Sequence, residues 1–386
     1  MARSGTVTDG LTEENYARAA LTYLAEPADR RLARLFREHG AARTLDAINS
    51  GRQLGSSSQG QGASMDRWRA RLPELPRQEQ LIAFRESGIR LICPGDPEWP
   101  GQLADLGDDE PYALWVRGSA DLRFSCLRSV AIVGARAATA YGSYVAAEFA
   151  ASVAARGWAV VSGGAFGVDA AAHRGALSAD GVTIAVLACG VDVPYPSAHA
   201  DLLDAIAAQG VLASEWPPGR QVSRLRFLVR NRVIAALATG TLVVEASHRS
   251  GAINTARHAR DLQRRLMAVP GPVTSDLSAG CHHIIREWQG VLVTSAAEVT
   301  ENLSPVGATV PAQLGVALLP RDALGQDQAT VLDAMPRRGG SGTVRVAQRA
   351  GMDPATVVRC LGELSAAGFI ERCDDGWRLR RPATAR

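Results

Sequence analysis

The chain has 386 residues, of which 46% are hydrophobic and 5% aromatic, and its formal net charge is +3. This length is enough for two or three domains, and so small a net charge does not by itself indicate a nucleic-acid partner. No lysine occurs, so all 42 basic residues are arginine. The absence of lysine excludes a Schiff-base lysine and the P-loop lysine of nucleotide-binding proteins.

The cysteines and the apolar runs limit the class of protein further. The six cysteines are irregularly spaced and form no Cys-x-x-Cys pair, which argues against a zinc site and a disulfide framework. The first residues contain no apolar signal core, and no apolar run approaches the ~20 residues needed to span a bilayer. We therefore expect a cytoplasmic protein that has no membrane segment and holds no metal.

Residues 1–110 are expected to form a helical, SAM-like N-terminal region. Leucines at helical spacing run through residues 11–50, and a second helical piece covers about 74–87. Glycine, serine and glutamine dominate a segment near 55–63, which predicts a flexible insertion. Short strands are expected near 89–92 and 112–116.

Residues 111–302 show short apolar runs that alternate with helical segments, which predicts an α/β domain. The expected architecture is Rossmann-like, with a doubly wound, mostly parallel sheet whose strands are apolar on both faces. The expected strands lie at 129–133, 159–162, 183–187, 211–213, 241–244, 266–269 and 291–293. The expected helices lie near 141–155, 168–178, 198–208, 228–238, 252–263 and 281–288.

Proline and glycine in residues 303–325 predict a linker, and residues 326–386 then form a small third unit. Helices near 327–336, 343–350 and 354–366 precede an Asp-Gly turn between two short strands, which is the order of a winged helix. The alternative is a small α+β oligomerisation module. Arg345, Arg349 and Arg359 are either phosphate contacts or solvated side chains, because a winged helix need not bind DNA.

Two glycine-containing segments follow expected strands, where open α/β sheets bind their ligands. Gly134 allows close approach of the backbone to a ligand, and Arg136 can clamp a phosphate. In the next segment Gly163, Gly164 and Gly167 can form an anion nest before a helix, which makes Gly163 and Gly164 candidate phosphate contacts. Neither segment is Gly-x-Gly-x-x-Gly, so a dinucleotide cofactor is not expected.

Several polar side chains near these strand ends have more than one interpretation. Asp169 and His173, four residues apart on one helix, form either a base with its orienting partner or a helix cap with a neighbouring contact. We favour the cap, because no nucleophile is implied nearby.

Glu245 ends a strand and can hold a ribose, a loop amide or an arginine. His282 and His283, with no acidic third ligand, do not predict a metal site.

The segment between Glu215 and Glu245 contains no acidic residue. Its five arginines therefore lack partners in the local sequence, and an aromatic residue, Phe227, is interleaved with them. Positive charge beside an aromatic platform is typical of sequence-independent single-strand binding, and the alternative is a solvated basic helix. The five arginines are Arg220, Arg224, Arg226, Arg230 and Arg232.

A set of short motifs occurs in a fixed order between residues 130 and 293. The motifs occupy 132–136, Thr139, 141–142, 162–163, 167–169, His173, 175–177, 190–192, 195–196, 214–215, 230–235, 244–246, 250–251, 255–256, 268–271 and 280–281. In this order they resemble the DprA/Smf family of DNA-processing proteins. The flanking helical region and winged helix are also similar to longer members of that family.

The resemblance implies a Rossmann-like protein that binds and protects single-stranded DNA, forms a homodimer and loads the RecA recombinase in natural transformation and recombination. It implies neither an enzyme nor a cofactor. The family's basic pocket corresponds to Gly134, Arg136, Gly163, Phe227, Arg230 and Asn231. Lysines of the family are absent, so Arg224, Arg226 or Arg264 is expected to replace them. The chain departs from the family pattern at Ala135, Leu228, Asn254 and His282.

Two other functions remain as alternatives at this stage. Residues 238–245 faintly resemble part of the nucleoside-monophosphate phosphoribohydrolases, but the preceding Pro-Gly-Gly is missing, and this favours binding over nucleotide hydrolysis. The second alternative is a transcription regulator in which the winged helix reads duplex DNA and the α/β domain senses a ligand.

Overall fold

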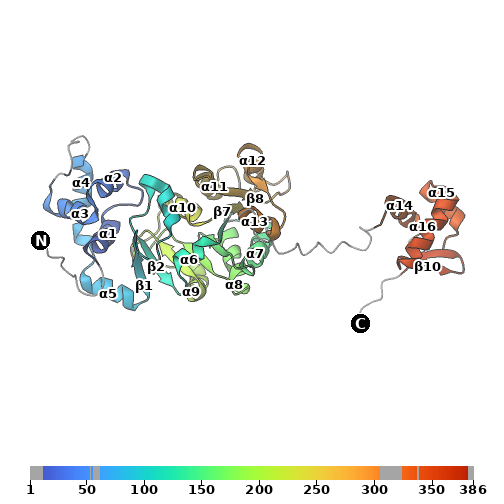
Figure 1. Cartoon of the computed structure of the whole chain (residues 1–386), viewed down its shortest axis with the longest axis horizontal. Helices are drawn as coiled ribbons and strands as arrows, with labels where there is room; N and C mark the ends of the chain where they lie inside the picture. Colours follow the sequence, from blue (N-terminus) through green and yellow to red (C-terminus); the bar gives the residue numbers. More distant parts are fainter. Residues whose placement is uncertain (1–11, 53, 55–60, 305–323, 337–338, 381–386) are drawn as a thin grey trace. The chain divides into compact units, whose positions relative to one another are not determined.

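The computed structural model describes residues 12–52, 54, 61–304, 324–336 and 339–380. The chain divides into two compact units, Met1–Val310 and Pro311–Arg386 (Figure 1). Most of the insertion expected near 55–63 and most of the linker expected at 303–325 lie outside the described residues.

The first unit begins with a group of helices that has its own hydrophobic core. Thr12 and Asp29 cap two of the helices by accepting backbone N–H groups, and Gly40, at φ 81°, separates the second helix from the third. Leu21, Leu32 and other buried side chains join the helices, so the expected helical N-terminal region is present. The elements are α1 (Glu13–Leu24), α2 (Arg30–His39), α3 (Ala41–Ser50), α4 (Gln61–Ala70), η1 (Leu72–Glu74) and α5 (Gln78–Glu86).

Nine strands of the first unit form one sheet in the order β1-β2-β6-β5-β4-β3-β7-β8-β9. All neighbouring pairs from β6 to β9 are parallel, and β1 and β2 add an antiparallel edge. This confirms the doubly wound, mostly parallel sheet. The strands are β1 (Ile89–Ile92), β2 (Leu114–Gly118), β3 (Ser129–Val133), β4 (Ala159–Ser162), β5 (Thr183–Val186), β6 (Val211–Ser214), β7 (Gly240–Val243), β8 (Arg265–Ala268) and β9 (Val291–Leu292).

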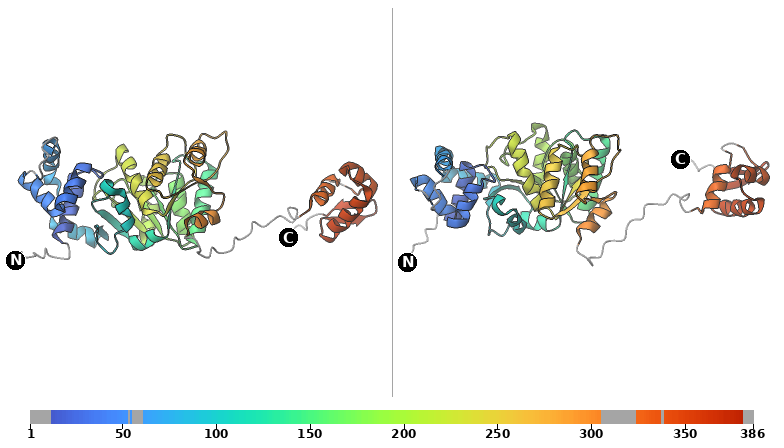
Figure 2. Two further views of the ribbon diagram at one scale, coloured as in Figure 1. Left: turned by 45° about the horizontal axis from the view of Figure 1, so that its top comes forward. Right: turned by 90° about the horizontal axis from the view of Figure 1, so that it is seen from above.

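Helices cover both faces of this sheet (Figure 2). The β3 side chains alternate between the faces: Ala131 and Val133 join one buried cluster, and Val130 and Ile132 join the other. The remaining helices of the unit are η2 (Gly101–Asp109), α6 (Leu122–Leu127), α7 (Ala140–Ala154), α8 (Val168–Ser178), η3 (Ser197–His199), α9 (Ala200–Gln209), α10 (Arg224–Leu237), α11 (Gly251–Asp261), α12 (Ala279–Glu287) and α13 (Ala296–Leu303).

The strand order places a topological switch point between β3 and β7. Strands β4 to β6 follow β3 in one direction across the sheet, and β7 to β9 extend in the other. The connections that leave β3 and β7 therefore diverge, and a crevice opens beyond the carboxyl ends of these two strands. The division expected at residue 110 falls inside the sheet, because β1 precedes it and pairs with β2.

The second unit contains three helices followed by a two-stranded antiparallel sheet, which is the element order expected of a winged helix. Gly351, in the left-handed conformation, ends the second helix, and Asp353 caps the third. Arg359 forms ion pairs with Glu363 and Asp327. The elements are α14 (Gln326–Ala334), α15 (Thr343–Ala350), α16 (Pro354–Ala366), β10 (Ile370–Cys373) and β11 (Gly376–Leu379).

Candidate nucleic-acid interface

A cavity of about 700 Å³ opens at the switch point. Val133, which ends β3, and the following residues 134–137 form one wall, and Ser247, Ser250 and Gly251, which follow β7, form another. Residues of α10 between Arg224 and Ile234 provide a third wall. The cavity therefore lies beyond the carboxyl ends of the strands, as the sequence predicts for a ligand site.

Arg136, Phe227 and Tyr195 form a cluster at the edge of this cavity. The guanidinium carbon of Arg136 lies 4.7 Å from the centre of the Phe227 ring, and the Tyr195 and Phe227 ring centres are 5.6 Å apart. All three residues also line a neighbouring cavity of about 50 Å³. Arg136 is exposed and has no ion pair with any described carboxylate. The cluster thus presents an exposed guanidinium without an ion pair beside aromatic rings, and it lines both cavities.

The glycines of the loop after β4 allow close contacts between backbone segments. A Cβ on Gly163 would overlap the Arg230 guanidinium and the Asp169 carboxylate. Gly167 has φ 74°, and a Cβ there would overlap the carbonyl oxygens of Ala135 and Arg136. The glycines therefore let the loop after β4 lie against the loop after β3.

Arg230 is buried beneath these loops, with only 4% of its surface exposed. Its guanidinium donates to the carbonyl oxygen of Gly163 at 2.6 Å and to that of Val186, so it joins the ends of β4 and β5. Burial lowers the pKa of Arg230 to about 10, although nearby Asp169 acts in the opposite direction. These contacts fix the loops. The sequence suggests that Arg230 contacts a phosphate directly, whereas in the structure its guanidinium donates to backbone carbonyl oxygens.

Asn231 also has a positioning role. Its Nδ2 donates to the carbonyl oxygen of Gly251 and to Oδ1 of Asn254, each at 3.2 Å. These contacts tie α10 to the first turn of α11. Asn254, one of the departures from the family pattern, therefore has a defined partner in this chain.

Asp169 and His173 do not form a catalytic pair. Asp169 accepts the N–H of Ala165 at 3.3 Å, and burial raises its pKa despite the nearby charge of Arg230. His173 Nδ1 lies 2.7 Å from Thr183 Oγ1, whose own proton is donated to the carbonyl oxygen of Val160. His173 is therefore a buried neutral imidazole that donates through Nδ1, and burial lowers its pKa to about 3.

The arginine-rich segment contains no acid of its own, as the sequence shows, but three of its five arginines form ion pairs with acids outside the segment. Arg220 meets Glu74 at 2.5 Å, and Arg226 meets Glu26 at 2.6 Å. Each of these acids belongs to the helical N-terminal region. Among the described residues, Arg224 has no ion pair, and it is exposed and lines the large cavity.

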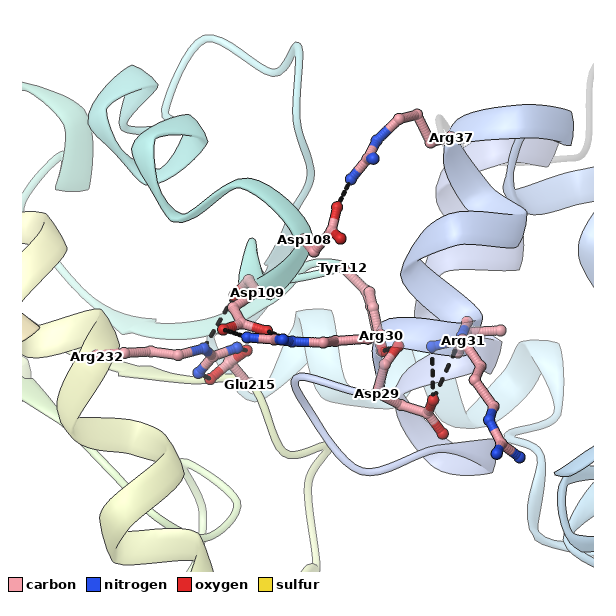
Figure 3. Close-up of polar contacts among 10 residues, drawn as sticks. Asp29, Arg30, Arg31, Arg37, Asp108, Asp109, Tyr112, Glu215 and Arg232 are labelled. Atoms are coloured by element: carbon pink, nitrogen blue, oxygen red, sulfur yellow. Dashed lines mark hydrogen bonds and ion pairs between the residues drawn. The ribbon is translucent and has the colours of Figure 1, made fainter. Parts of the chain in front are cut away.

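Arg232 is buried in a group of polar side chains that also contains Glu215, Asp109 and Arg30 (Figure 3). Its guanidinium donates to both carboxylate oxygens of Glu215, at 2.5 and 2.6 Å, and to the carbonyl oxygen of Asp109. The Asp109 carboxylate in turn holds Arg30 of α2. Arg232 therefore links α10 to the N-terminal region and does not face the cavity.

Arg226 and Arg264 do not line either cavity. Arg264 directly precedes β8, so it lies at the amino ends of the parallel strands, opposite the cavity, and pairs with Asp105 at 2.7 Å. Of the three arginines expected to replace family lysines at the pocket, Arg224 lines the large cavity, and Arg226 and Arg264 line neither cavity.

Two aromatic residues of the site were not identified from the sequence. Tyr195 lies beside Phe227, and Phe166, within the glycine loop, is 48% exposed and packs on His199. The available signal was an aromatic residue in each segment that follows a strand.

Glu245 accepts hydrogen bonds from the backbone N–H and the side-chain hydroxyl of Thr139, which caps the start of α7. Of the three roles expected for Glu245, the structure therefore shows the one in which it holds a loop amide.

Among the described residues, no group of three or more His, Cys, Asp or Glu side chains is arranged to hold a metal ion. His282 Nε2 instead lies 3.0 Å from the carbonyl oxygen of Gly271. Within the described part of the chain, no helix combines the length and apolar character needed to cross a bilayer.

Comparison with known proteins agrees with this geometry. The family model described as DNA recombination-mediator protein A matches residues 90–304. The putative DNA processing protein DprA of Mycobacterium tuberculosis is 43% identical over 375 residues, covering 94% of each chain. Protein Smf of Escherichia coli is 36% identical over 333 residues, covering 82% of this chain and 85% of its own length.

Two solved structures share the fold. DNA processing protein A from Streptococcus pneumoniae superposes with a TM-score of 0.60 at 29% identity, covering 76% of this chain and 98% of its own. DNA processing protein A from Helicobacter pylori, described for its single-stranded DNA binding mode, gives 0.51 at 27% identity, covering 56% and 95%. From the switch-point cavity and these relatives together, we conclude that the chain belongs to the DprA/Smf family.

Proposed function

We propose that the chain binds single-stranded DNA at the switch-point cavity and acts in DNA processing during transformation and recombination. The observation that carries the proposal is the cluster of Arg136, Phe227 and Tyr195, in which an unpaired cation lies against aromatic rings at the cavity edge. The Helicobacter pylori relative, which binds single-stranded DNA, supports it.

Each part of the cluster suits one part of a nucleotide. Arg136 and Arg224 are exposed and free of described ion pairs, so they can neutralise phosphates. The Phe227 ring can stack a base, and such stacking contributes about 1–3 kcal/mol per base. Because the faces of paired bases are buried inside a duplex, this site favours single strands.

The cavity favours binding over catalysis. Asp169, the carboxylate among its described lining residues, is engaged by the Ala165 N–H and is close to Arg230. Ser250 accepts the N–H of Ile253 as a helix cap. Neither Asp169 nor Ser250 is arranged as a nucleophile beside a base. The described lining of the cavity therefore does not support the alternative function of a nucleotide hydrolase.

Titration of fluorescent oligo(dT) with purified protein tests the proposal. Arg136→Ala and Phe227→Ala should each weaken binding by about tenfold, since each removes a contact worth on the order of 1–2 kcal/mol. Arg264→Ala is a matched control, because it removes an arginine from the opposite end of the strands. If the first two variants bind as tightly as the unchanged protein, the cavity is not the DNA site.

Protection of the strand, formation of a homodimer and loading of RecA belong to the same proposal, and the family resemblance supports them. Light scattering measures the dimer, and nuclease digestion of bound oligonucleotide measures protection. RecA loading predicts faster assembly of RecA on labelled single-stranded DNA in the presence of this protein. We also propose that residues 1–110, 111–302 and 326–386 act as three functional parts, with β1 of the first part completing the sheet of the second.

A further inference from the structure

The arginines of the segment around α10 connect the DNA site to the helical N-terminal region. Arg220 donates to the carbonyl oxygen of Tyr23 and to Glu74, and Arg226 donates to Glu26. Arg232 reaches the carbonyl oxygen of Asp109. One side of α10 is therefore attached to residues that lie more than 100 positions earlier in the chain.

Glu26 is the most fully engaged acid of this attachment. Its carboxylate accepts from Arg226 Nε at 3.0 Å, from Arg226 Nη2 at 2.6 Å and from Trp216 Nε1 at 3.0 Å. The Arg226 guanidinium also lies 5.7 Å from the centre of the Trp216 ring, and its side chain is only 16% exposed. Burial acts to raise the pKa of Glu26, but these hydrogen bonds outweigh burial and lower it.

Within its own segment, the first turn of α10 is tied to the preceding loop by the bond that Arg226 donates to the carbonyl oxygen of Gln221. Ser223, at the N-cap position, makes no side-chain cap hydrogen bond. That turn nevertheless carries Arg224 and Phe227, both of which line the large cavity. Arg226, in the same turn, lines neither cavity, so its contact with Glu26 holds the turn from outside the cavity.

We propose that Glu26 and Arg226 are positioning residues for the DNA site, through which the helical N-terminal region holds the first turn of α10 where Phe227 can stack a base. This proposal rests on the proposed function. It assigns a role to the N-terminal region and it removes Arg226 from the DNA contacts.

Binding of labelled oligo(dT) to the full chain, followed by fluorescence anisotropy, tests the proposal. Glu26→Gln leaves Arg226 without its ion-pair partner, and we expect about three- to tenfold weaker binding. Arg226→Glu should weaken binding at least as much, because two acids then face each other. The double variant Glu26→Arg, Arg226→Glu restores the ion pair and should recover most of the lost affinity.

Arg37→Gln provides the matched control. Arg37 pairs with Asp108, which also joins the helical region to the rest of the unit, but the pair does not touch α10 (Figure 3). This variant should bind DNA like the unchanged protein. Circular dichroism of each variant checks that the chain is folded. Trp216→Phe is a milder second variant, because it removes one hydrogen-bond donor to Glu26 and keeps an aromatic ring. It should weaken oligo(dT) binding less than Glu26→Gln does.

The outcomes separate this proposal from the proposed function. If the unchanged protein does not bind oligo(dT), or Phe227→Ala has no effect, the proposed function fails. If Phe227→Ala weakens binding but Glu26→Gln does not, the positioning role is overturned. Tighter binding by Glu26→Gln, or no recovery in the double variant, would instead make Arg226 a direct DNA contact and would also overturn it.

Discussion

Arg136, Arg230 and Arg232 have the same side chain but different surroundings. Arg136 keeps its guanidinium in solvent against Phe227, Arg230 donates to two buried carbonyl groups, and Arg232 forms a buried ion pair with Glu215. The geometry of these contacts therefore leaves Arg136 free for a ligand. The other two hold loops and helices in place.

His173 provides a prediction at the residue scale. Its folded-state pKa of about 3 lies below the unfolded value of about 6.5, so the unfolded chain binds the extra proton as the pH falls. This residue therefore contributes stability that is present above about pH 6.5 and decreases toward pH 3.

Urea unfolding at pH 7 and pH 5.5 measures this effect. The unchanged protein should lose about 1 kcal/mol more than His173→Gln between these two values, because glutamine does not titrate. Because the loss in unfolding free energy is compared between two proteins that differ at one residue, the contributions of the other titrating groups cancel. Equal losses in the two proteins would show that His173 has the same pKa in the folded and unfolded states.

At the scale of elements, the apolar pattern was sufficient for most helices and strands. Helix α8 has the bounds expected from the sequence, and so do β3, α15 and α16. Helix α10 was expected at 228–238 but begins at Arg224. Its first turn has no side-chain cap and is held by Glu26, a contact that no local pattern can show.

The candidate site was only partly predictable for the same reason. The positions of Gly134 and Arg136 follow from the strand order, since both come after β3 at the switch point. The acids that compensate Arg220 and Arg226 lie 146 and 200 residues earlier in the chain. The absence of acids between Glu215 and Glu245 therefore could not predict the net charge around the folded helix α10.

The loop after β4 provides a prediction at the element scale. In Gly163→Ala the new Cβ would overlap Arg230 and Asp169, so we expect a loss of about 1–3 kcal/mol in the free energy of unfolding. Weaker oligo(dT) binding should accompany it, because the same loop forms part of the smaller cavity beside Phe227.

Gly251→Ala is the control for this substitution. Gly251 also lines the large cavity, but a Cβ there would lie 4.0 Å from its nearest neighbour, Asn231 Nδ2. Thermal unfolding and anisotropy of both variants make the comparison. A Gly163→Ala protein as stable as Gly251→Ala would show that the loop can move away from Arg230.

At the scale of the whole molecule, each of the two units has its own hydrophobic core. The cavity, the aromatic cluster and the attachment to the N-terminal region all lie in the first unit. A chain ending at residue 304 should therefore bind oligo(dT) within about twofold of the full chain.

Competition between single-stranded and duplex DNA, measured for both proteins by gel shift, tests this expectation. The preference for single strands should be the same in each. A large loss of single-strand affinity on truncation would contradict the assignment of the site to the first unit. A loss confined to duplex DNA would show that the winged-helix unit has a separate binding role.

The contact between Glu26 and Arg226 also has a consequence for synthesis of the chain. Glu26 is synthesised 200 residues before Arg226. At about 5–20 residues per second this interval lasts roughly 10–40 s. The N-terminal helices can complete their own core during that time. On this view the proposed DNA site reaches its final geometry only after α10 emerges and packs against the N-terminal helices.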